Sequence, residues 1–222
     1  MIVMGYDTET QSFPLYKEPS EHPDQPHIVE LAAILMDDAT RTELKRMHRI
    51  VRPDGWVSSP EALAVHGITH ERAMDEGVPE RQVMEEFHAL QLQADLRIGH
   101  NESFDQRIMR IGYKRHTIGF NSSAMPEQEY RDEIADAFKA RLSYCTKNGS
   151  RKDYNLPPTP AMLKKNMRFP KDPKLSEAYM HYFNTEMQGA HSALHDTQNT
   201  LRVYYAITQG VRDPNAVTFA AA

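Results

Sequence analysis

The stretch HIVELAAILMDD, residues 27–38, constrains the fold more than any other part of the sequence. It is apolar almost throughout instead of alternating with polar residues, which is typical of a strand covered on both faces in the middle of a sheet. A second apolar run, MIVMGYD at residues 1–7, predicts a first strand, and a weaker alternation in residues 43–53 predicts a third. Together the three strands are expected to form a meander.

Helical spacing of apolar residues follows these strands. The segment SPEALAVHGIT begins as a helix does, with Ser59 as the cap and Pro60 at the first position. A fourth strand is predicted at residues 95–101. Further helices are predicted at residues 78–93, 103–115, 127–142, 175–184 and 191–210, and the rest of residues 119–174 is expected to be irregular. This order predicts an α/β fold, with a mixed sheet covered by helices.

The chain has 222 residues, 40% of them hydrophobic, and we expect a single domain over residues 1–222 with a buried core. It has no apolar run near the roughly 18 residues that a membrane-spanning helix needs. Its N-terminus lacks the pattern of a signal peptide, so no membrane association is expected. Cys145 is the one cysteine, which excludes an internal disulfide and favours a reducing compartment, the cytoplasm.

The charge of the chain is unevenly distributed. Lys and Arg total 26 against 31 Asp and Glu, a formal charge of -5, which argues mildly against nucleic-acid binding. From Lys139 to Lys174, however, ten basic residues face only two acids, so this segment carries +8 and the remainder -13. Tyr144, Tyr154 and Phe169 lie within it. The basic region is either a solvated surface loop or a nucleic-acid contact.

Asp7 and Glu9 follow the first predicted strand in the sequence GYDTET. Side chains two apart on a strand point to the same face, so the two acids project together if the strand continues through Thr8. Neighbouring carboxylates repel each other unless a cation lies between them. A metal site and a pair of exposed loop acids are both compatible with this pattern.

Two further motifs carry acids. In GHNESFDQRIM, Asp105 lies in the first turns of a helix, where an acid also complements the helix dipole, and Phe104 beside it also suits the core. In GAHSALHDTQNTL, His191 and Asp196 are five apart, about 140° around a helix. The two converge only if His191 stays in the loop before the helix. His191 and His195, four apart, could instead be two zinc ligands on one helical face.

Hard divalent ions such as Mg²⁺ take oxygen ligands. Two of them about 4 Å apart can stabilise the attacking and leaving oxygens of a phosphodiester. That arrangement requires about four carboxylates and a base to deprotonate the water. The sequence supplies such a set in Asp7, Glu9, Asp105, Asp196 and His191.

With these motifs the sequence resembles the DEDD-superfamily 3'–5' exonucleases of the DEDDh, or DnaQ-like, branch. The matching pieces are DTET, HNESFD and HSALHD, which fits H-x-A-x-x-D, together with VHGIT at residues 65–69. The resemblance covers about residues 3–110 and 174–206. The loop of residues 10–27 is longer than in compact members, and an expanded basic region at about residues 121–174 matches nothing in the family pattern.

The resemblance implies an RNase H-like fold, a five-stranded mixed sheet with one antiparallel strand, flanked by helices. It implies two Mg²⁺ ions, replaceable by Mn²⁺, bound by Asp7, Glu9, Asp105 and Asp196, with His191 as the general base. It also implies a pocket for the terminal nucleotide lined by Thr8, Val65, His66, Asn101 and Phe104. We further expect Lys164, Lys165 and Arg168 in the basic region to contact the substrate strand.

The expected function is removal of nucleotides from the 3' end of single-stranded DNA, releasing nucleoside 5'-monophosphates. An RNA-directed exoribonuclease of the same fold is an alternative, because the discriminating contacts are to the 2' position. A non-catalytic nucleic-acid or polymerase-accessory module is a second alternative. No polymerase domain is recognised in the sequence, so a proofreading role would require a separate polymerase or repair protein.

Overall fold

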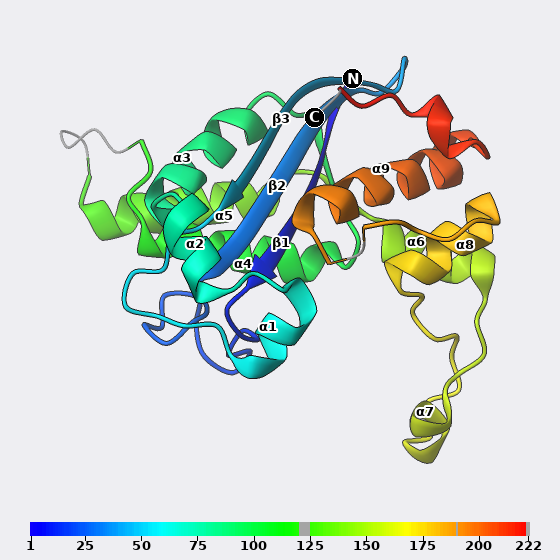
Figure 1. Ribbon diagram of the computed structural model, residues 1–222, viewed down its shortest axis with the longest axis horizontal. Helices are drawn as coiled ribbons and strands as arrows, with labels where there is room; N and C mark the ends of the chain where they lie inside the picture. Colours follow the sequence, from blue (N-terminus) through cyan, green and yellow to red (C-terminus); the bar gives the residue numbers. More distant parts are fainter. Residues whose placement is uncertain (120–124, 190, 221–222) are drawn as a thin grey trace.

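The structure, a computed structural model, describes residues 1–119, 125–189 and 191–220. A mixed sheet lies at its centre (Figure 1). In the described residues the sheet has five strands, in the order β3-β2-β1-β4-β5. They are β1 (Ile2–Thr10), β2 (Ile28–Asp37), β3 (Thr42–Ile50), β4 (Leu96–Gly99) and β5 (Ser143–Cys145). Because β2 runs antiparallel to β1 and β3 while β1, β4 and β5 are parallel, the predicted sheet with one antiparallel strand is confirmed.

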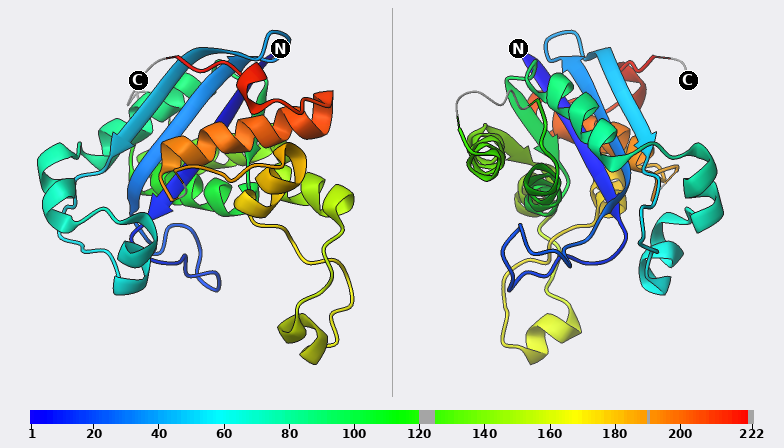
Figure 2. Two further views of the ribbon diagram at one scale, coloured as in Figure 1. Left: turned by 45° about the vertical axis from the view of Figure 1, so that its right-hand side comes forward. Right: turned by 90° about the vertical axis from the view of Figure 1, so that its left-hand side faces the viewer.

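Helices cover both faces of the sheet (Figure 2). One face is covered by α9 (Ala193–Gln209), with α8 (Leu175–Phe183) and α6 (Thr146–Tyr154) packed beside it. The other is covered by α3 (Glu80–Gln91) and α4 (Glu102–Arg115), and α5 (Glu127–Ala140) packs on α4. Three short helices are α1 (Pro60–His66), α2 (His70–Glu76) and α7 (Pro160–Lys164), and a single 3-10 turn covers Pro214–Ala216. In the described part of the chain, no helix has the length and apolar character needed to cross a membrane.

The alternation of side chains along β1 assigns residues to the two faces. Val3 packs in the cluster that contains Leu201 of α9, whereas Met4 and Tyr6 pack in the cluster on the α3 and α4 side. Between them, a Cβ on Gly5 would lie 2.6 Å from Cγ of Leu201, so only glycine lets α9 lie this close to the strand. Since odd-numbered positions face α9, the acids that follow on β1 point toward that helix.

Most predicted elements are found, with shifts of a few residues at their ends. The Ser59 cap is confirmed, since its Oγ accepts the Ala62 N–H at 3.1 Å. The α2 helix was not predicted. Residues 143–154, expected to be irregular, instead form β5 and α6. Residues 121–124 of the expected basic region lie outside the described residues.

Candidate active site at the carboxyl end of β1

β1 continues through Thr8 and carries Asp7 and Glu9 to the carboxyl end of the strand, both partly buried. Burial, followed by the charges of Asp105 and Asp196, raises the pKa of Asp7 well above its ordinary value. Burial and the charge of Asp196 likewise raise the pKa of Glu9 to about 8. Both shifts have the same physical cause, the burial of several carboxylates close together at one strand end.

Thr8 joins this strand end to α4. Its backbone N–H and its hydroxyl both donate to Oδ1 of Asp105, at 3.0 and 2.7 Å. Asp105 is 2% exposed, and burial raises its pKa to about 7 although the bonds from Thr8 favour the charged form. The third acid is therefore locked to the strand that carries the first two.

The start of α9 supplies the fourth acid and the histidine. His191 has a φ of 68°, so it stays in the loop before the helix, as convergence with Asp196 requires. Its backbone N–H donates to Oδ2 of Asp196 at 3.1 Å. Glu9, His191 and Asp196 each place one potential ligand atom within 4.8 Å of the others. These three residues can therefore share one metal ion.

The other oxygen of Asp196 fits the same interpretation. Oδ1 is buried and has no hydrogen-bond partner among the described residues, and burial raises the pKa of this carboxyl. A buried carboxylate oxygen without a partner is costly unless a cation approaches it. The donor set consists mainly of carboxylate oxygens, which suits a hard divalent cation. The residues present therefore fit such a metal.

His195 does not join this group. Among the described residues, the side chains found close enough together to share a metal ion include His191 but not His195. The ring of His195 instead lies over Gly189, where a Cβ would come within 2.6 Å of its Cγ. A zinc site built on the two histidines is therefore not supported by their positions.

Glu30 is a residue of this site that the motifs did not predict. It lies directly opposite Glu9 in the β1–β2 pair and is 3% exposed. Its Oε2 accepts the Ala193 N–H at 2.8 Å, and its Oε1 lies 2.6 Å from Nε2 of His48. Burial alone would raise the pKa of Glu30, but the bonds from His48 and Ala193 outweigh it and lower the pKa. Glu30 thus remains charged with both oxygens occupied.

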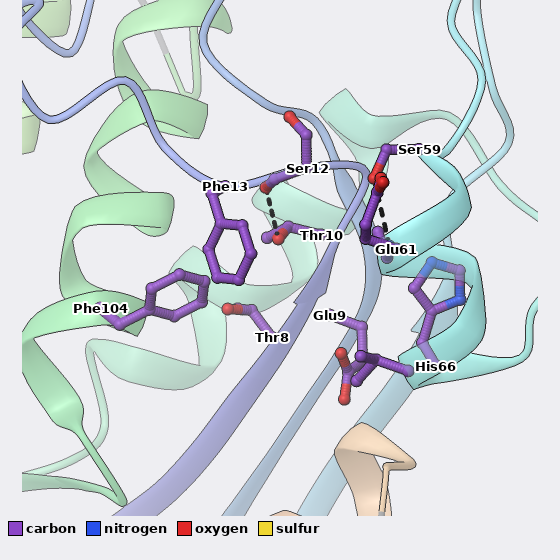
Figure 3. A pocket seen from close by; sticks show the side chains of 11 residues that line it. Thr8, Glu9, Thr10, Ser12, Phe13, Ser59, Glu61, His66 and Phe104 are labelled. Atoms are coloured by element: carbon purple, nitrogen blue, oxygen red, sulfur yellow. Dashed lines mark hydrogen bonds between the residues drawn. The ribbon is translucent and has the colours of Figure 1, made fainter. Parts of the chain in front are cut away.

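A cavity of about 130 Å³ opens beside Glu9 (Figure 3). Four of the residues predicted to hold the terminal nucleotide line it: Thr8, Val65, His66 and Phe104. Phe13, from the loop after β1, lies next to Phe104 on the side away from His66, and was not predicted. Ser12, Ser59 and Glu61 also line it. The cavity thus has two aromatic rings on one side, with His66 and Glu61 on the other.

His66, at the wall of this cavity, has a ring whose tautomer the structure defines. Its Nδ1 accepts the Ile68 N–H at 3.0 Å, so the ring proton lies on Nε2. Nε2 is buried without a partner among the described residues, and burial lowers the pKa of the ring. The neutral ring therefore carries an N–H that has no partner among the described residues.

Asn101, the fifth predicted pocket residue, is not among the residues that line the cavity. It has a left-handed backbone, with a φ of 75°, at the start of α4. Its Oδ1 accepts from Nζ of Lys147 at 2.7 Å. The prediction of Asn101 as a lining residue is thus not supported, because its amide faces the start of α6 instead.

Comparison with known proteins agrees with this geometry. The family model described as an exonuclease, named for RNase T, matches residues 4–204. The chain belongs to this exonuclease family. A comparison with curated proteins found no matching sequence.

Solved structures of exonuclease I share the fold. The E. coli enzyme in complex with a dA16 oligonucleotide has a TM-score of 0.66 at 18% identity, covering 97% of this chain and 42% of that one. The zinc-bound E. coli complex with single-stranded DNA has a TM-score of 0.64 at 17% identity, with the same coverage. A moderately thermophilic exonuclease I from Methylocaldum szegediense has a TM-score of 0.63 at 18% identity, covering 94% of this chain and 41% of that one. The chain thus spans about two fifths of the length of these structures.

Proposed function

We propose that this protein is a metal-dependent 3'–5' exonuclease that hydrolyses the terminal phosphodiester of single-stranded DNA and releases nucleoside 5'-monophosphates. The observation that carries the proposal is the convergence of Glu9, His191 and Asp196, each with a potential ligand atom within 4.8 Å of the others. Membership of the exonuclease family supports it, as does a fold shared with structures that hold DNA strands.

The four carboxylates of Asp7, Glu9, Asp105 and Asp196 are the proposed ligands of two Mg²⁺ ions, which Mn²⁺ could replace. Such ions, when bound, neutralise phosphate charge and lower the pKa of a coordinated water. The acidic site could not otherwise bind a polyanion, because its own charge would repel the phosphate.

His191 is the proposed general base. Its side chain is exposed, so the ring can accept a proton from a water molecule in the site. Its backbone N–H is hydrogen-bonded to Asp196, which keeps the residue beside the carboxylates. Thr8 has a positioning role, since its two bonds to Asp105 keep that carboxylate beside β1.

The cavity beside Glu9 is the proposed site of the 3'-terminal nucleotide. The rings of Phe13 and Phe104 offer a surface on which a base can stack, and His66 lines the cavity opposite them. Val65, 51% exposed, offers apolar contact at the rim. Asn101 is left out of the proposed nucleotide site because its amide binds Lys147.

RNA remains a second candidate substrate, and a separate polymerase or repair protein would be the partner in a proofreading role. A cytoplasmic location is part of the proposal, based on the single cysteine, Cys145.

Digestion of 5'-labelled DNA and RNA single strands with Mg²⁺, with and without EDTA, tests activity, polarity and sugar preference together. A ladder that shortens from the 3' end and stops in EDTA is expected for DNA. Immediate release of a labelled mononucleotide would show the opposite polarity, and cleavage in EDTA would exclude the metal mechanism. Strand binding without any cleavage would support the non-catalytic module.

A further inference from the structure

Between α6 and α8 the chain leaves the body of the protein as an arm, residues 155–173, with α7 near its tip (Figures 1 and 2). Pro157 and Pro158 lie on the outgoing leg, and Pro170 and Pro173 on the returning leg. Proline fixes its own φ and restricts the preceding residue to extended backbone, so such legs are stiff. The two legs therefore hold the tip away from the protein surface.

The tip of the arm is folded. The Thr159 side chain caps α7 by accepting the Met162 N–H at 3.2 Å. After the helix, the Met167 N–H donates back to the Met162 carbonyl at 2.9 Å. Asn166 takes the left-handed conformation, with a φ of 58°, that this return requires. The side chains at the tip are therefore displayed on an ordered turn.

The tip carries positive charge that no acid among the described residues neutralises. Lys164, Lys165 and Arg168 are exposed, and none of them forms an ion pair with the described residues. No acid occurs between Asp153 and Asp172. Because cations gathered on one turn repel each other, such an arrangement favours a polyanionic partner.

Apolar side chains accompany these charges. Phe169 is 48% exposed and Leu163 is 53% exposed. A basic surface with an exposed aromatic ring is typical of single-strand binding, in which cations contact phosphates and the ring stacks on a base.

At the base of the arm, in contrast, basic side chains are paired with an acid and the two legs are hydrogen-bonded to each other. Asp172 pairs with Arg151 at 3.1 Å and with Lys147 at 3.6 Å. The Lys171 N–H donates to the Leu156 carbonyl at 3.0 Å and joins the two legs. The charge on the arm therefore has two parts, a structural one at the base and a free one at the tip.

The base of the arm is also hydrogen-bonded to His100, which lies in the turn between β4 and α4, before Asp105. Nε2 of His100 donates to the Pro173 carbonyl at 3.1 Å, and its Nδ1 lies 2.9 Å from Oγ1 of Thr146. Burial lowers the pKa of His100 to about 4, so the ring stays neutral and keeps this pattern. His100 directly follows β4, at the carboxyl end of the parallel strands where the carboxylates also lie, and it precedes Asp105 by five residues. The arm thus starts beside the candidate active site.

We propose that the arm is a second nucleic-acid contact, which binds the phosphates and one base of the substrate strand upstream of its 3' end. The inference rests on the proposed exonuclease function for the identity of the strand. α7 and α1, which borders the nucleotide cavity, project from the end of the sheet at which β1 finishes (Figures 1 and 2). A strand whose 3' end lies in the cavity can therefore be held by the arm at a second point.

The test compares two double variants, each of which replaces two exposed lysines that form no ion pair with the described residues. Both are made in the Asp7→Asn protein so that the strand is bound but not cut. Lys164→Ala/Lys165→Ala alters the tip, and Lys45→Ala/Lys139→Ala is the control on other surfaces. Binding of a labelled 20-nucleotide strand is followed by fluorescence anisotropy over a series of KCl concentrations. The salt slope should decrease by about 0.7 per lost contact in the arm variant, hence by about 1.4, and stay unchanged in the control.

A kinetic comparison adds a second readout in the protein with an intact Asp7. The ratio of kcat/KM on the long strand to kcat/KM on a dinucleotide should fall roughly tenfold in the arm variant, because a dinucleotide does not extend to the tip. Phe169→Ala should weaken binding of the long strand about 5- to 100-fold, the range for losing one base stack, and Leu163→Ala much less.

The outcomes separate the two proposals. Equal salt slopes in the arm variant and the control, in a protein that does degrade long strands, would overturn the arm and leave the exonuclease function intact. Arm-dependent strand binding in a protein that releases no nucleotide would overturn the exonuclease function and leave the arm intact. Thermal unfolding of each variant checks that the fold is retained.

Discussion

The carboxylate of Glu30 accepts the backbone N–H of Ala193 at 2.8 Å and joins the middle of the sheet to the first residue of α9. Ser192, at the cap position of this helix, makes no side-chain cap bond. Glu30 therefore supplies the missing acceptor from another element. Since Glu30 lies opposite Glu9 across the β1–β2 pair, this bond fixes the start of α9, and with it Asp196, relative to the acids of β1.

Glu30→Ala should weaken Mn²⁺ binding and lower kcat, each by about 10- to 100-fold, the usual range for a residue that orients metal ligands. Glu30→Gln should lose less, because its amide oxygen can still accept the Ala193 N–H. Electron paramagnetic resonance of a Mn²⁺ titration measures the affinity without requiring activity. Full Mn²⁺ affinity in Glu30→Ala would show that α9 is positioned by its packing alone.

The stability of the metal-free protein should depend on pH through the acidic cluster. Glu9, whose ordinary pKa is 4.5, has a pKa raised to about 8 in the folded protein. Below the unfolded value the acid is protonated in both states, whereas between about pH 4.5 and 8 the unfolded chain has released this proton and the folded protein still binds it, so a rise in pH favours unfolding. In EDTA, the Tm should therefore fall between about pH 5 and pH 8.

Two comparisons isolate this effect from other titrations. Glu9→Gln should show a shallower decrease of Tm with pH, because the amide does not ionise. Mg²⁺ should raise the Tm more at about pH 8 than at about pH 5, since its ligands must be deprotonated. A Tm profile identical in Glu9→Gln and the unaltered protein would contradict a strained acidic cluster.

The central strands could be predicted because their signal is local. Residues 28–36 are buried in one unbroken run, which the apolar sequence shows directly. β5 and α6 could not, because their positions depend on distant partners. β5 has three residues and is placed by pairing with β4. α6 has the polar sequence TKNGSRKDY and is fixed by burial of Thr146 and Ser150, so it shows no apolar period.

The candidate site likewise contains residues that the sequence predicts and residues that it does not. The acids and the histidine lie in three short motifs, so their convergence in one site could be expected from the sequence. Glu30 could not be recognised as a neighbour of Glu9, because that depends on strand register. Phe13 enters the cavity because its loop folds back onto α4, where Arg107 donates to the Leu15 carbonyl at 3.0 Å. Neither relationship leaves a trace in the local sequence.

His191→Ala should lower kcat by roughly 10²- to 10⁴-fold, the range for loss of a general base. His195→Ala is the matched control, since its ring lies over Gly189 and is not among the side chains found close enough together to share a metal ion. A larger loss in His195→Ala than in His191→Ala would show that the roles of the two histidines are reversed.

Phe13→Ala should raise KM for single strands about 5- to 100-fold, the effect of losing one base stack, while leaving the Tm nearly unchanged. The ring is 78% exposed, so its loss removes little from the core. Phe104→Ala should differ, because that ring also packs against the buried cluster on the α4 side, and its loss should lower the Tm as well as raise KM.

Tyr16→Ala is the control for Phe13, because Tyr16 belongs to the same loop and is 65% exposed but does not line the cavity. Steady-state kinetics of the three variants on one labelled strand, with thermal unfolding of each, separates stacking from loop stability. If Phe13→Ala and Tyr16→Ala change KM equally, the loop acts through its general shape. The terminal base would then stack on Phe104 alone.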